Sequence, residues 1–430
     1  MALITQGPKG TQDLMPKDTA KWQIVEEVMK GEASLHGFHE VRTPVFEHTE
    51  LFLRGVGDTT DVVEKQMYTF EDKGQRSITL RPEGTAGVVR AMLQSGIYNE
   101  GYPVKLCYFT SCYRYEKPQA GRLREFHQFG IEMFGASEPV ADAEVILVAK
   151  GIFDRLGVKN LRLELNSIGC PKCRANYHKA LKEYFQQYKE ELCTTCLSRL
   201  ERNPMRILDC KSEICSKIAE GAPKIVEFLC DECQEHFTGV QEALTAAGVE
   251  FVLNPTIVRG LDYYTRTVFE FVSCDLGSQS TVCGGGRYDG LVEEMGGKPT
   301  AGLGFGLGME RLMLILQAQG IELPESEKCE IYIASMGKEA LKKAIALATE
   351  LRNCGVYAEY DLCGRGLKAQ MKYADKIGAA YTIVLGDNEI AENKAQLKNM
   401  KSGEKKDISL GENFLDDYLS NTVDAEILNF

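Results

Sequence analysis

The sequence predicts an α+β core with an antiparallel sheet flanked by helices, followed by a smaller C-terminal α/β domain. Residues 161–166 (LRLELN) and 265–273 (TRTVFEFVS) alternate or are rich in β-branched and aromatic side chains, which is typical of antiparallel strands. Beyond residue 329, strand-like and helix-like segments alternate, which indicates an α/β unit of about a hundred residues. Since 430 residues exceed what one core usually serves, two or three domains are expected.

The N-terminal part of the chain predicts one helix and several strands. Apolar residues at helical spacing predict an amphipathic helix over 19–37. Pro44 lies within a strand-like run, and because proline has no N–H to donate, we expect an edge or interface strand there. Residues 104–116 and 125–135 predict two strands joined by the polar loop 117–124.

The pattern changes near the C-terminus. Residues 300–317 predict a glycine-rich strand that runs into a helix with a nearly continuous apolar face, and residues 320–328 (GIELPESEK) read as a linker. The segments beyond it predict, in order, a strand at 330–335, a helix at 338–353, a strand at 356–362, a helix at 366–377 and a strand at 381–386.

Composition narrows the classes of protein. A hydrophobic content of 44%, a charged content of 26% and no apolar stretch long enough to span a bilayer predict a globular protein without a membrane partner. The net charge of -12 argues against a basic nucleic-acid-binding coat, although it leaves a local basic patch possible. The first residues lack the pattern of a secretory signal, so a cytoplasmic location is expected.

Eight of the fifteen cysteines lie between residues 170 and 233. Three C-x-x-C pairs in one segment are typical of structural zinc sites, because each pair supplies two ligands of a tetrahedral centre. Reduced thiols at helix starts are the alternative, and the spacing leaves open which pairs combine. The candidate ligands are Cys170, Cys173, Cys193, Cys196, Cys210, Cys215, Cys230 and Cys233.

Arg114, Arg259 and Arg311 each lie among glycines, aromatics or carboxylates. A packed core excludes arginine in such a setting unless the charge has a partner or a ligand. A structural ion pair explains one such arginine, but three together predict a polyphosphate site. Residues 302–308 (GLGFGLG) carry glycine at every second position, which does not meet the dinucleotide-binding spacing G-x-G-x-x-G. We expect the bare face of this strand to accept a flat ligand or another backbone.

These segments together resemble a known family. Arg114-x-Glu116 with Arg122, and the glycine-rich strand followed by Glu310-Arg311, are similar to motifs 2 and 3 of class II aminoacyl-tRNA synthetases, and Pro44 to motif 1. RGLDYYTRTVFE (259–270) and GGGRYDGL (284–291) resemble the two signatures of histidyl-tRNA synthetases. The resemblance implies a class II catalytic domain over 1–325, an inserted, mostly helical domain over 170–250 and an anticodon-binding domain over 326–430.

The resemblance also implies the chemistry. A histidine–tRNA ligase activates L-histidine with ATP and Mg²⁺, releases pyrophosphate and transfers histidine to tRNA(His), here as a homodimer. Fixed guanidinium groups suit this reaction, because the attacking carboxylate and the α-phosphate repel each other. By resemblance, Arg114 holds the α-phosphate, Arg311 the γ-phosphate and Arg259 both the carboxylate and the α-phosphate. Glu116 and Arg122 complete the implied ATP site.

The remaining implied residues bind histidine and tRNA. The α-amino group is implied to bind Glu83, Thr85 and Gln128. The two ring nitrogens are implied to bond Tyr264 and Glu132, which is expected to be ionised. The pocket is implied to be lined by Tyr263 and Tyr288. A site that bonds both nitrogens rejects analogues that lack one. For tRNA, the implied contacts are Lys117 and Gln119 in the loop and Lys368 and Lys372 at helical spacing in the C-terminal domain, where Lys376 continues the stripe.

Two other functions are compatible with parts of the sequence. A non-catalytic regulatory subunit of ATP phosphoribosyltransferase shares the core, but it lacks the anticodon domain and parts of the signatures, whereas this chain keeps both. A nucleotide-binding redox enzyme would rest only on the glycines and the C-x-x-C pairs, and the failed dinucleotide-binding spacing counts against it.

Overall fold

The computed structural model describes residues 5–56, 62–210, 212–259, 261–276, 280–324 and 328–422. The chain forms two compact units, Met1–Pro324 and Glu325–Phe430. Within the described ranges, no helix combines the length and the apolar character needed to cross a membrane.

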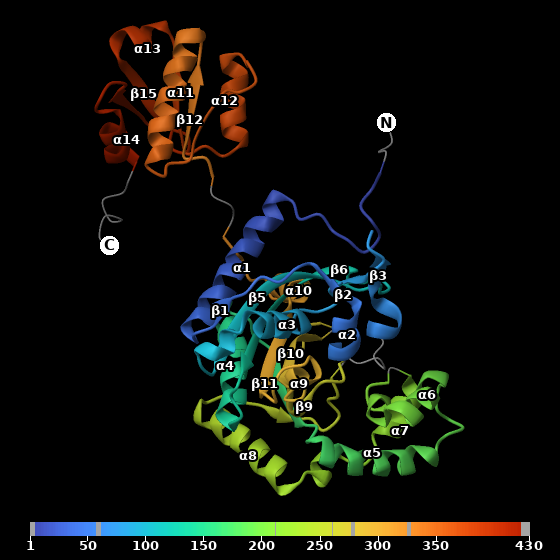
Figure 1. Ribbon diagram of the computed structural model, residues 1–430. Coiled ribbons are helices and arrows are strands. Elements are labelled where there is room, and N and C mark those ends of the chain that lie inside the picture. Colours follow the sequence, from blue (N-terminus) through green and yellow to red (C-terminus); the bar gives the residue numbers. More distant parts are fainter. Residues whose placement is uncertain are drawn as a thin grey trace. The chain divides into compact units, whose positions relative to one another are not determined.

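Unit 1 is built on a large, mostly antiparallel sheet (Figure 1). The short strands at its two edges pair in parallel, and the strands between them pair antiparallel. This confirms the predicted fold class. The strand order is β1 (His39–Glu40), β5 (Val104–Tyr113), β6 (Glu125–Phe134), β11 (Gly302–Gly308), β10 (Thr281–Arg287), β9 (Thr265–Ser273), β7 (Leu161–Ser167) and β8 (Val252–Leu253).

Helices cover both faces of this sheet. One face packs against α1 (Pro16–Leu35), α4 (Pro139–Arg155), α8 (Asp231–Ala246) and α10 (Met309–Ala318), whose buried side chains join those of β6, β9 and β11 in one apolar core. The other face packs against α3 (Thr85–Ser95) and α9 (Leu291–Glu294). The sheet therefore lies between two cores, and the second one borders the candidate site.

The predicted strand around Pro44 is wrong in its position. Pro44 lies in an irregular segment before β2 (Phe46–His48), and the Arg81 side chain donates to the carbonyl oxygens of both Thr43 and Pro44. The strand starts later because these carbonyl groups serve a side chain and not a neighbouring strand. β2 is still an edge strand, in a small sheet with β4 (Ser77–Leu80) and β3 (Tyr68–Glu71), next to α2 (Thr49–Val56).

The sequence reading missed β10, the strand between β9 and β11. Its three consecutive glycines, Gly284, Gly285 and Gly286, weaken strand propensity. A Cβ on Gly285 would lie 2.1 Å from the carbonyl oxygen of Gly304 on β11. Close approach to the neighbouring backbone therefore explains glycine at this position.

The cysteine-rich segment folds into helices that form a lobe at the edge of unit 1 (green in Figure 1). These are α5 (Pro171–Gln186), α6 (Thr194–Arg202) and α7 (Glu213–Ala219), and the chain then enters α8. Tyr177, Leu181 and Phe185 of α5 are buried against Leu200 of α6, so the lobe has apolar packing of its own.

Unit 2 contains a five-stranded sheet among its described residues. Its strands are β13 (Ala358–Tyr360), β12 (Ile331–Ser335), β14 (Tyr381–Leu385), β15 (Lys394–Asn399) and β16 (Lys405–Ser409), in that order, with α11 (Lys338–Asn353), α12 (Leu367–Lys376), α13 (Asp387–Glu392) and α14 (Phe414–Thr422). The alternating α/β prediction is confirmed. It missed β15 and β16, because these strands are rich in lysine and other polar residues, so that they resemble loops.

Candidate active site

A cavity of about 560 Å³ opens on the side of the large sheet that carries α3. Its walls come from the start of α3, the loop between β5 and β6, the strands β9 to β11 and the start of α10. It brings together most of the predicted site residues from distant parts of the chain: Glu83, Thr85, Arg114, Glu116, Arg122, Gln128, Arg259, Tyr263, Tyr264 and Arg311.

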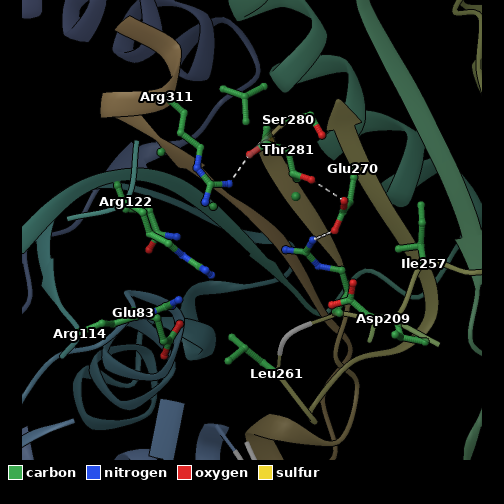
Figure 2. Close-up of a pocket in the computed structure, with 18 of the residues that line it drawn as sticks. Glu83, Arg114, Arg122, Asp209, Ile257, Leu261, Glu270, Ser280, Thr281 and Arg311 are labelled. Atoms are coloured by element: carbon green, nitrogen blue, oxygen red, sulfur yellow. Dashed lines mark hydrogen bonds and ion pairs between the residues drawn. The ribbon is translucent and has the colours of Figure 1, made fainter. Parts of the chain in front are cut away.

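Basic side chains gather at one end of this cavity. Figure 2 shows Arg114, Arg122 and Arg311 along one side, with Glu270 and Thr281 across from them. Burial and the charges of Arg122 and Arg114 lower the pKa of Arg311. Mutual repulsion of this kind is relieved when an anion binds between the guanidinium groups. The cluster is therefore suited to a polyphosphate.

Backbone carbonyl groups hold two of these arginines in place. Nε of Arg114 donates to the carbonyl oxygen of Pro82 at 2.8 Å, and Nε of Arg311 donates to that of Gly121 at 3.2 Å. Arg122 forms an ion pair with Glu116. Such contacts reduce the rotamer freedom of each side chain before a ligand arrives, which is the basis of preorganised charge stabilisation.

Arg259 lies deeper in the cavity and pairs with Glu270 of β9. Burial alone lowers the pKa of Arg259, but the Glu270 carboxylate and Tyr264 outweigh it and raise the pKa. Within the described residues, Nε of Arg259 is buried without a hydrogen-bond partner. A Cβ on Gly284 would lie 2.4 Å from the Arg259 guanidinium, so this glycine provides the space for it. The buried, unpaired donor is suited to an incoming anion.

The other end of the cavity is acidic and aromatic. Glu132 is 1% exposed and accepts hydrogen bonds from Thr85 at 2.7 Å, from Tyr108 at 3.2 Å and from the hydroxyl group of Tyr288. Glu132 and Tyr288 lie behind the residues that line the cavity. The ring centroids of Tyr263 lie 4.7 Å from Tyr264 and 5.5 Å from Tyr288.

Burial opposes the ionised state that was expected for Glu132. Burial raises the pKa of Glu132 to about 8, although the hydroxyl groups of Tyr288 and Thr85 act in the opposite direction. The neighbouring carboxylate of Glu83 raises it further. Removal from water and the nearby acid therefore favour the protonated form of this carboxyl group, whereas the hydroxyl donors favour the ionised form.

Glu83 caps the first turn of α3. Its carboxylate accepts the backbone N–H of Thr85 at 2.7 Å and that of Ala86 at 2.8 Å. Burial raises the pKa of Glu83, against the effect of these two donors. Because Glu83 also lines the cavity, its carboxylate is available to a cationic ligand group while the helix holds it in place.

The alternating glycines of β11 face side chains of the pocket. A Cβ would lie 2.5 Å from the Tyr288 ring at Gly302, 2.1 Å from Glu132 Oε2 at Gly304 and 2.0 Å from Gln128 Nε2 at Gly306. The bare face was expected to accept a ligand or another backbone. The carbonyl oxygen of Ile131 does lie 2.2 Å from a Cβ at Gly304, and Gly306 does line the cavity, whereas Gly302 faces only the Tyr288 ring. At Gly308 no atom lies within 4 Å of a Cβ, and this residue lines the cavity.

This arrangement predicts a difference between two glycine variants. We expect Gly304→Ala to lower the free energy of unfolding by about 1 to 3 kcal/mol, the usual cost of overpacking a core. Its new methyl group would also lie 2.2 Å from the carbonyl oxygen of Ile131, which cannot rotate away. Gly308→Ala, on the same strand, is the control and should change the unfolding free energy by less than about 0.5 kcal/mol. Urea unfolding followed by circular dichroism measures both, and equal effects would contradict the interpretation.

Sequence reasoning missed Tyr108, whose hydroxyl group reaches Glu132 from β5. Its ring occupies the space above Gly84 and Gly130, where a Cβ would lie 2.2 and 2.3 Å from it. The available signal for Tyr108 was the pair of glycines that its ring faces. Because these glycines lie on separate segments of the chain, the signal is not visible in the sequence. Glu270 was also missed, since a carboxylate in a strand reads as solvent-exposed until its arginine partner is known.

The predicted tRNA contacts lie outside the cavity. Lys117 and Gln119 are exposed on the loop between β5 and β6, where Gln119 and Arg122 form an isolated bridge. Lys368, Lys372 and Lys376 are all exposed on α12 of unit 2. The helical spacing therefore produces a basic stripe on one exposed face.

The eight cysteines between residues 170 and 233 fall into two groups of four. The outer group consists of Cys170, Cys173, Cys230 and Cys233, and the inner group of Cys193, Cys196, Cys210 and Cys215. In each group the sulfur atoms all lie within 4.8 Å of one another. Burial raises the pKa values of the Cys170 and Cys193 thiols, but N–H groups at the helix starts and neighbouring thiols outweigh it and lower both to about 7.

Comparison with known proteins identifies the family of the chain. The family profile described as "Histidyl-tRNA synthetase" matches residues 10–312, and the profile "Anticodon binding domain" matches residues 330–415. Histidine–tRNA ligases of Acetivibrio thermocellus and Clostridium perfringens are 57% and 54% identical, each over 95% of this chain and 98% of the relative.

A solved structure shows the same architecture. The apo crystal structure of S. aureus histidyl-tRNA synthetase is 39% identical, covers 97% of this chain and 100% of its own, and superposes with a TM-score of 0.82. Together with the matched profile and the near full-length relatives, this shows that the chain belongs to the histidyl-tRNA synthetase family.

Proposed function

We propose that this chain is a histidine–tRNA ligase that forms histidyl-adenylate from L-histidine and ATP and then transfers histidine to tRNA(His). The observation that carries the proposal is a cavity that has carboxyl and tyrosine groups in its lining as well as a guanidinium cluster, which Figure 2 shows along one side. Such a cavity binds a polyphosphate and an amino acid with a polar aromatic side chain side by side.

At the basic end, the carboxylate oxygen of histidine attacks the α-phosphorus and pyrophosphate leaves. Arg259 stabilises the charge that develops between carboxylate and α-phosphate, with Arg114 on the α-phosphate and Arg311 on the γ-phosphate. Glu116, held by its ion pair with Arg122, contacts the adenine. These roles rest on the geometry of the cavity and on the family's motifs.

Mg²⁺ accompanies ATP in this proposal. Carboxylates of Glu116, Glu270 and Glu310 line the same cavity as the arginines, so oxygen ligands of the kind that Mg²⁺ prefers are present. When bound, the ion neutralises the β- and γ-phosphates. The arginines and the ion then share one task, the stabilisation of phosphate charge.

At the acidic end, Glu83, Thr85 and Gln128 bind the α-amino group of histidine. Glu132 accepts a hydrogen bond from one ring nitrogen, and the hydroxyl group of Tyr264 serves the other. Tyr263 and Tyr288 enclose the ring. An analogue that lacks one ring nitrogen would leave one of the two buried polar groups without a hydrogen-bond partner. The box therefore selects histidine strongly.

Transfer requires the 3′ end of tRNA(His) to reach the adenylate, where its terminal hydroxyl attacks the carbonyl and AMP leaves. We assign the catalytic domain to residues 1–325, the inserted domain to 170–250 and the anticodon-binding domain to 326–430. Lys117 and Gln119 contact the acceptor end, and the stripe of Lys368, Lys372 and Lys376 contacts the anticodon stem. Exposed lysines bind phosphates without selecting a sequence.

The proposal includes an assembly and a location. Val45 and Phe46, at the edge strand β2, are 42% and 56% exposed, and Leu53 and Phe70 are exposed as well. Exposed apolar side chains of this kind suit a homodimer contact. The fifteen cysteines are free thiols, which fits the reducing cytoplasm. The eight clustered thiols hold structural zinc and take no part in the reaction.

Pyrophosphate exchange into ATP, measured with each of the twenty amino acids in turn, tests the proposal. We expect exchange with histidine and at least about a hundredfold less with any other amino acid, since discrimination by buried hydrogen-bonding groups reaches this size. Exchange with none would favour the regulatory subunit of ATP phosphoribosyltransferase. That alternative is already disfavoured by the match of residues 330–415 to an anticodon-binding domain.

A further inference from the structure

The two cysteine groups have the dimensions of tetrathiolate metal sites. The Sγ atom of Cys170 lies 3.6 Å from that of Cys173 and 4.0 Å from that of Cys230. The Sγ atoms of Cys193 and Cys210 lie 3.9 Å apart. With zinc–sulfur bonds of about 2.3 Å, the edges of a tetrahedron are about 3.8 Å long. A disulfide requires about 2.05 Å, so the thiols converge on a centre without bonding in pairs.

Helix starts and backbone donors surround the sulfur atoms. Cys170, Cys193 and Cys230 immediately precede α5, α6 and α8, and helix N-termini stabilise thiolates. The N–H of Cys230 donates to Cys173 Sγ at 3.1 Å, and the N–H of Cys193 donates to Cys215 Sγ at 3.3 Å. Such N–H···S bonds are the outer partners that orient metal-bound thiolates.

The outer group closes the inserted segment at its base. Its first pair follows β7 after Ile168 and Gly169, and its second pair begins α8, which packs on the large sheet. A Cβ on Gly169, whose φ is +66°, would lie 2.5 Å from Cys173 Cβ, so the turn into the site is tight. An ion at this position joins the two ends of the lobe that carries the inner group.

Residues next to the outer group, Gly169 and Arg174, are hydrogen-bonded to Tyr264 and to the strand that follows it. The carbonyl oxygen of Gly169 accepts the N–H of Arg266 at 3.0 Å and the hydroxyl group of Thr265 at 3.1 Å. Arg174, in the first turns of α5, donates to the carbonyl oxygen of Tyr264 at 3.0 Å. The base of the lobe therefore holds the end of the segment that lines the cavity.

The inner group holds the other end of that segment. The chain between its two pairs carries Asn203 and Arg206, whose side chains lie 3.3 Å and 3.0 Å from Asp262 Oδ1. Asp262 directly precedes Tyr263. Arg199, Arg206 and Asp209, all between Cys196 and Cys210, also line the cavity itself.

We propose that the inserted lobe binds two zinc ions at separate tetrathiolate sites, and that these ions fix residues 262–266 from both ends and so position the histidine-binding tyrosines. The outer site uses Cys170, Cys173, Cys230 and Cys233, and the inner site Cys193, Cys196, Cys210 and Cys215. The metal sites stand on their own geometry, whereas their effect on histidine rests on the proposed function. The cysteines are positioning residues and contact no substrate.

Metal analysis of the full-length chain, produced in zinc-supplemented medium and kept reduced, tests the sites. We expect two zinc ions and no iron per chain, with four sulfur neighbours at about 2.3 Å in X-ray absorption. Fewer than two ions after reconstitution with excess zinc, nitrogen or oxygen neighbours in the first shell, or an iron–sulfur cluster would overturn the assignment. These readouts need only the unaltered protein.

Single substitutions then separate the two sites. Cys173→Ser should leave one ion, Cys196→Ser should leave one ion, and the double variant should leave none. Cys354→Ser is the matched control, since Cys354 is an exposed thiol outside both groups, and it should retain two ions. Loss of both ions in each single variant would contradict separate sites.

The positioning role is tested by histidine binding. Loss of the inner ion in Cys196→Ser should weaken histidine binding, measured directly by calorimetry, by about tenfold, within the range typical of coupled sites, while ATP binding changes by less than about twofold. Asp262→Asn should keep both ions and weaken histidine binding similarly. Unchanged histidine affinity in a Cys196→Ser protein that has lost its ion would refute the positioning role.

Exchange assays on the same preparations separate this inference from the proposed function. Protein with two zinc ions but no histidine-dependent exchange would overturn the function and leave the metal sites standing. Full exchange by protein that binds no zinc would overturn the metal sites and leave the proposed function standing.

Discussion

Arg259→Ala is expected to slow histidine-dependent pyrophosphate exchange by about a hundredfold or more, the usual cost of removing a preorganised charge partner of the transition state. Arg259 lines the cavity, and its Nε is buried and has no partner among the described residues. The substitution removes the only group that we assign to both the carboxylate and the α-phosphate.

Arg259→Lys should recover little of this loss. Lysine restores the positive charge but not the planar, two-pronged guanidinium group. A single ammonium group cannot contact both the carboxylate and the α-phosphate, so one of these anions keeps its charge uncompensated. The maximal rate should fall more than the affinity for either substrate, because the interaction strengthens as the bond forms.

Two further variants decide why the rate falls. Removing Arg259 also exposes the carboxylate of Glu270, whose charge would repel the phosphates. If that repulsion were the cause, the double variant Arg259→Ala/Glu270→Gln would recover the rate, and we expect that it does not. Arg155→Ala removes another arginine–glutamate ion pair, with Glu32 and away from the cavity, and should leave exchange unchanged. Near-normal exchange in Arg259→Ala would refute the assigned role.

Histidine affinity is expected to rise with pH up to about 8 and then to level off. The raised pKa of Glu132 means that its carboxyl group holds a proton at neutral pH before histidine binds. An imidazole N–H that donates to Glu132 favours the ionised form and lowers its pKa in the complex. Binding therefore releases a proton, and affinity increases by up to about tenfold per pH unit below pH 8.

Glu132→Gln should remove this pH dependence, because glutamine does not titrate. At pH 8.5 we expect it to weaken histidine binding by about 2 to 3 kcal/mol, as for a charge-assisted hydrogen bond left imperfectly paired. At pH 7 the difference should be about 1 kcal/mol smaller, since the unaltered protein must first lose its proton. ATP binding should not change.

Calorimetry between pH 7.0 and 8.5, in buffers with different ionisation enthalpies, measures both affinity and proton release. Tyr264→Phe is the matched control, because it should weaken histidine binding and keep the pH dependence. A Glu132→Gln protein with the same slope as the unaltered one would show that another group loses the proton. An unchanged histidine affinity in both variants would remove these residues from the imidazole site.

Much of this protein was predictable from sequence because the relevant signals are local. The period-2 pattern of residues 265–273 predicts a strand whose observed bounds, Thr265–Ser273, are the same. The glycine and proline residues of the linker 320–328 indicated where the α/β unit begins. The family signatures are contiguous segments, so their residue types identified the family without any knowledge of contacts.

Other features depended on neighbours that the sequence does not bring together. The glycines of β11 face Tyr288, Glu132 and Gln128 because β11 lies beside β6 in one register, and that register is set by the whole sheet. Tyr108 reaches Glu132 across another pairing, that of β5 with β6. A period-2 pattern shows which residues share a face, but it does not show what covers that face.

By itself, then, the sequence determined the fold class, the family and the residue types of the site, because each of these follows from the order and spacing of residues along the chain. Only the tertiary structure decided the raised pKa of Glu132 and the grouping of the cysteines. Burial among other acids sets the pKa of Glu132, and solvent exclusion is a property of the packed molecule. The eight thiols divide as they do because Cys170 and Cys230, 60 residues apart, meet only once the starts of α5 and α8 come together in the folded chain.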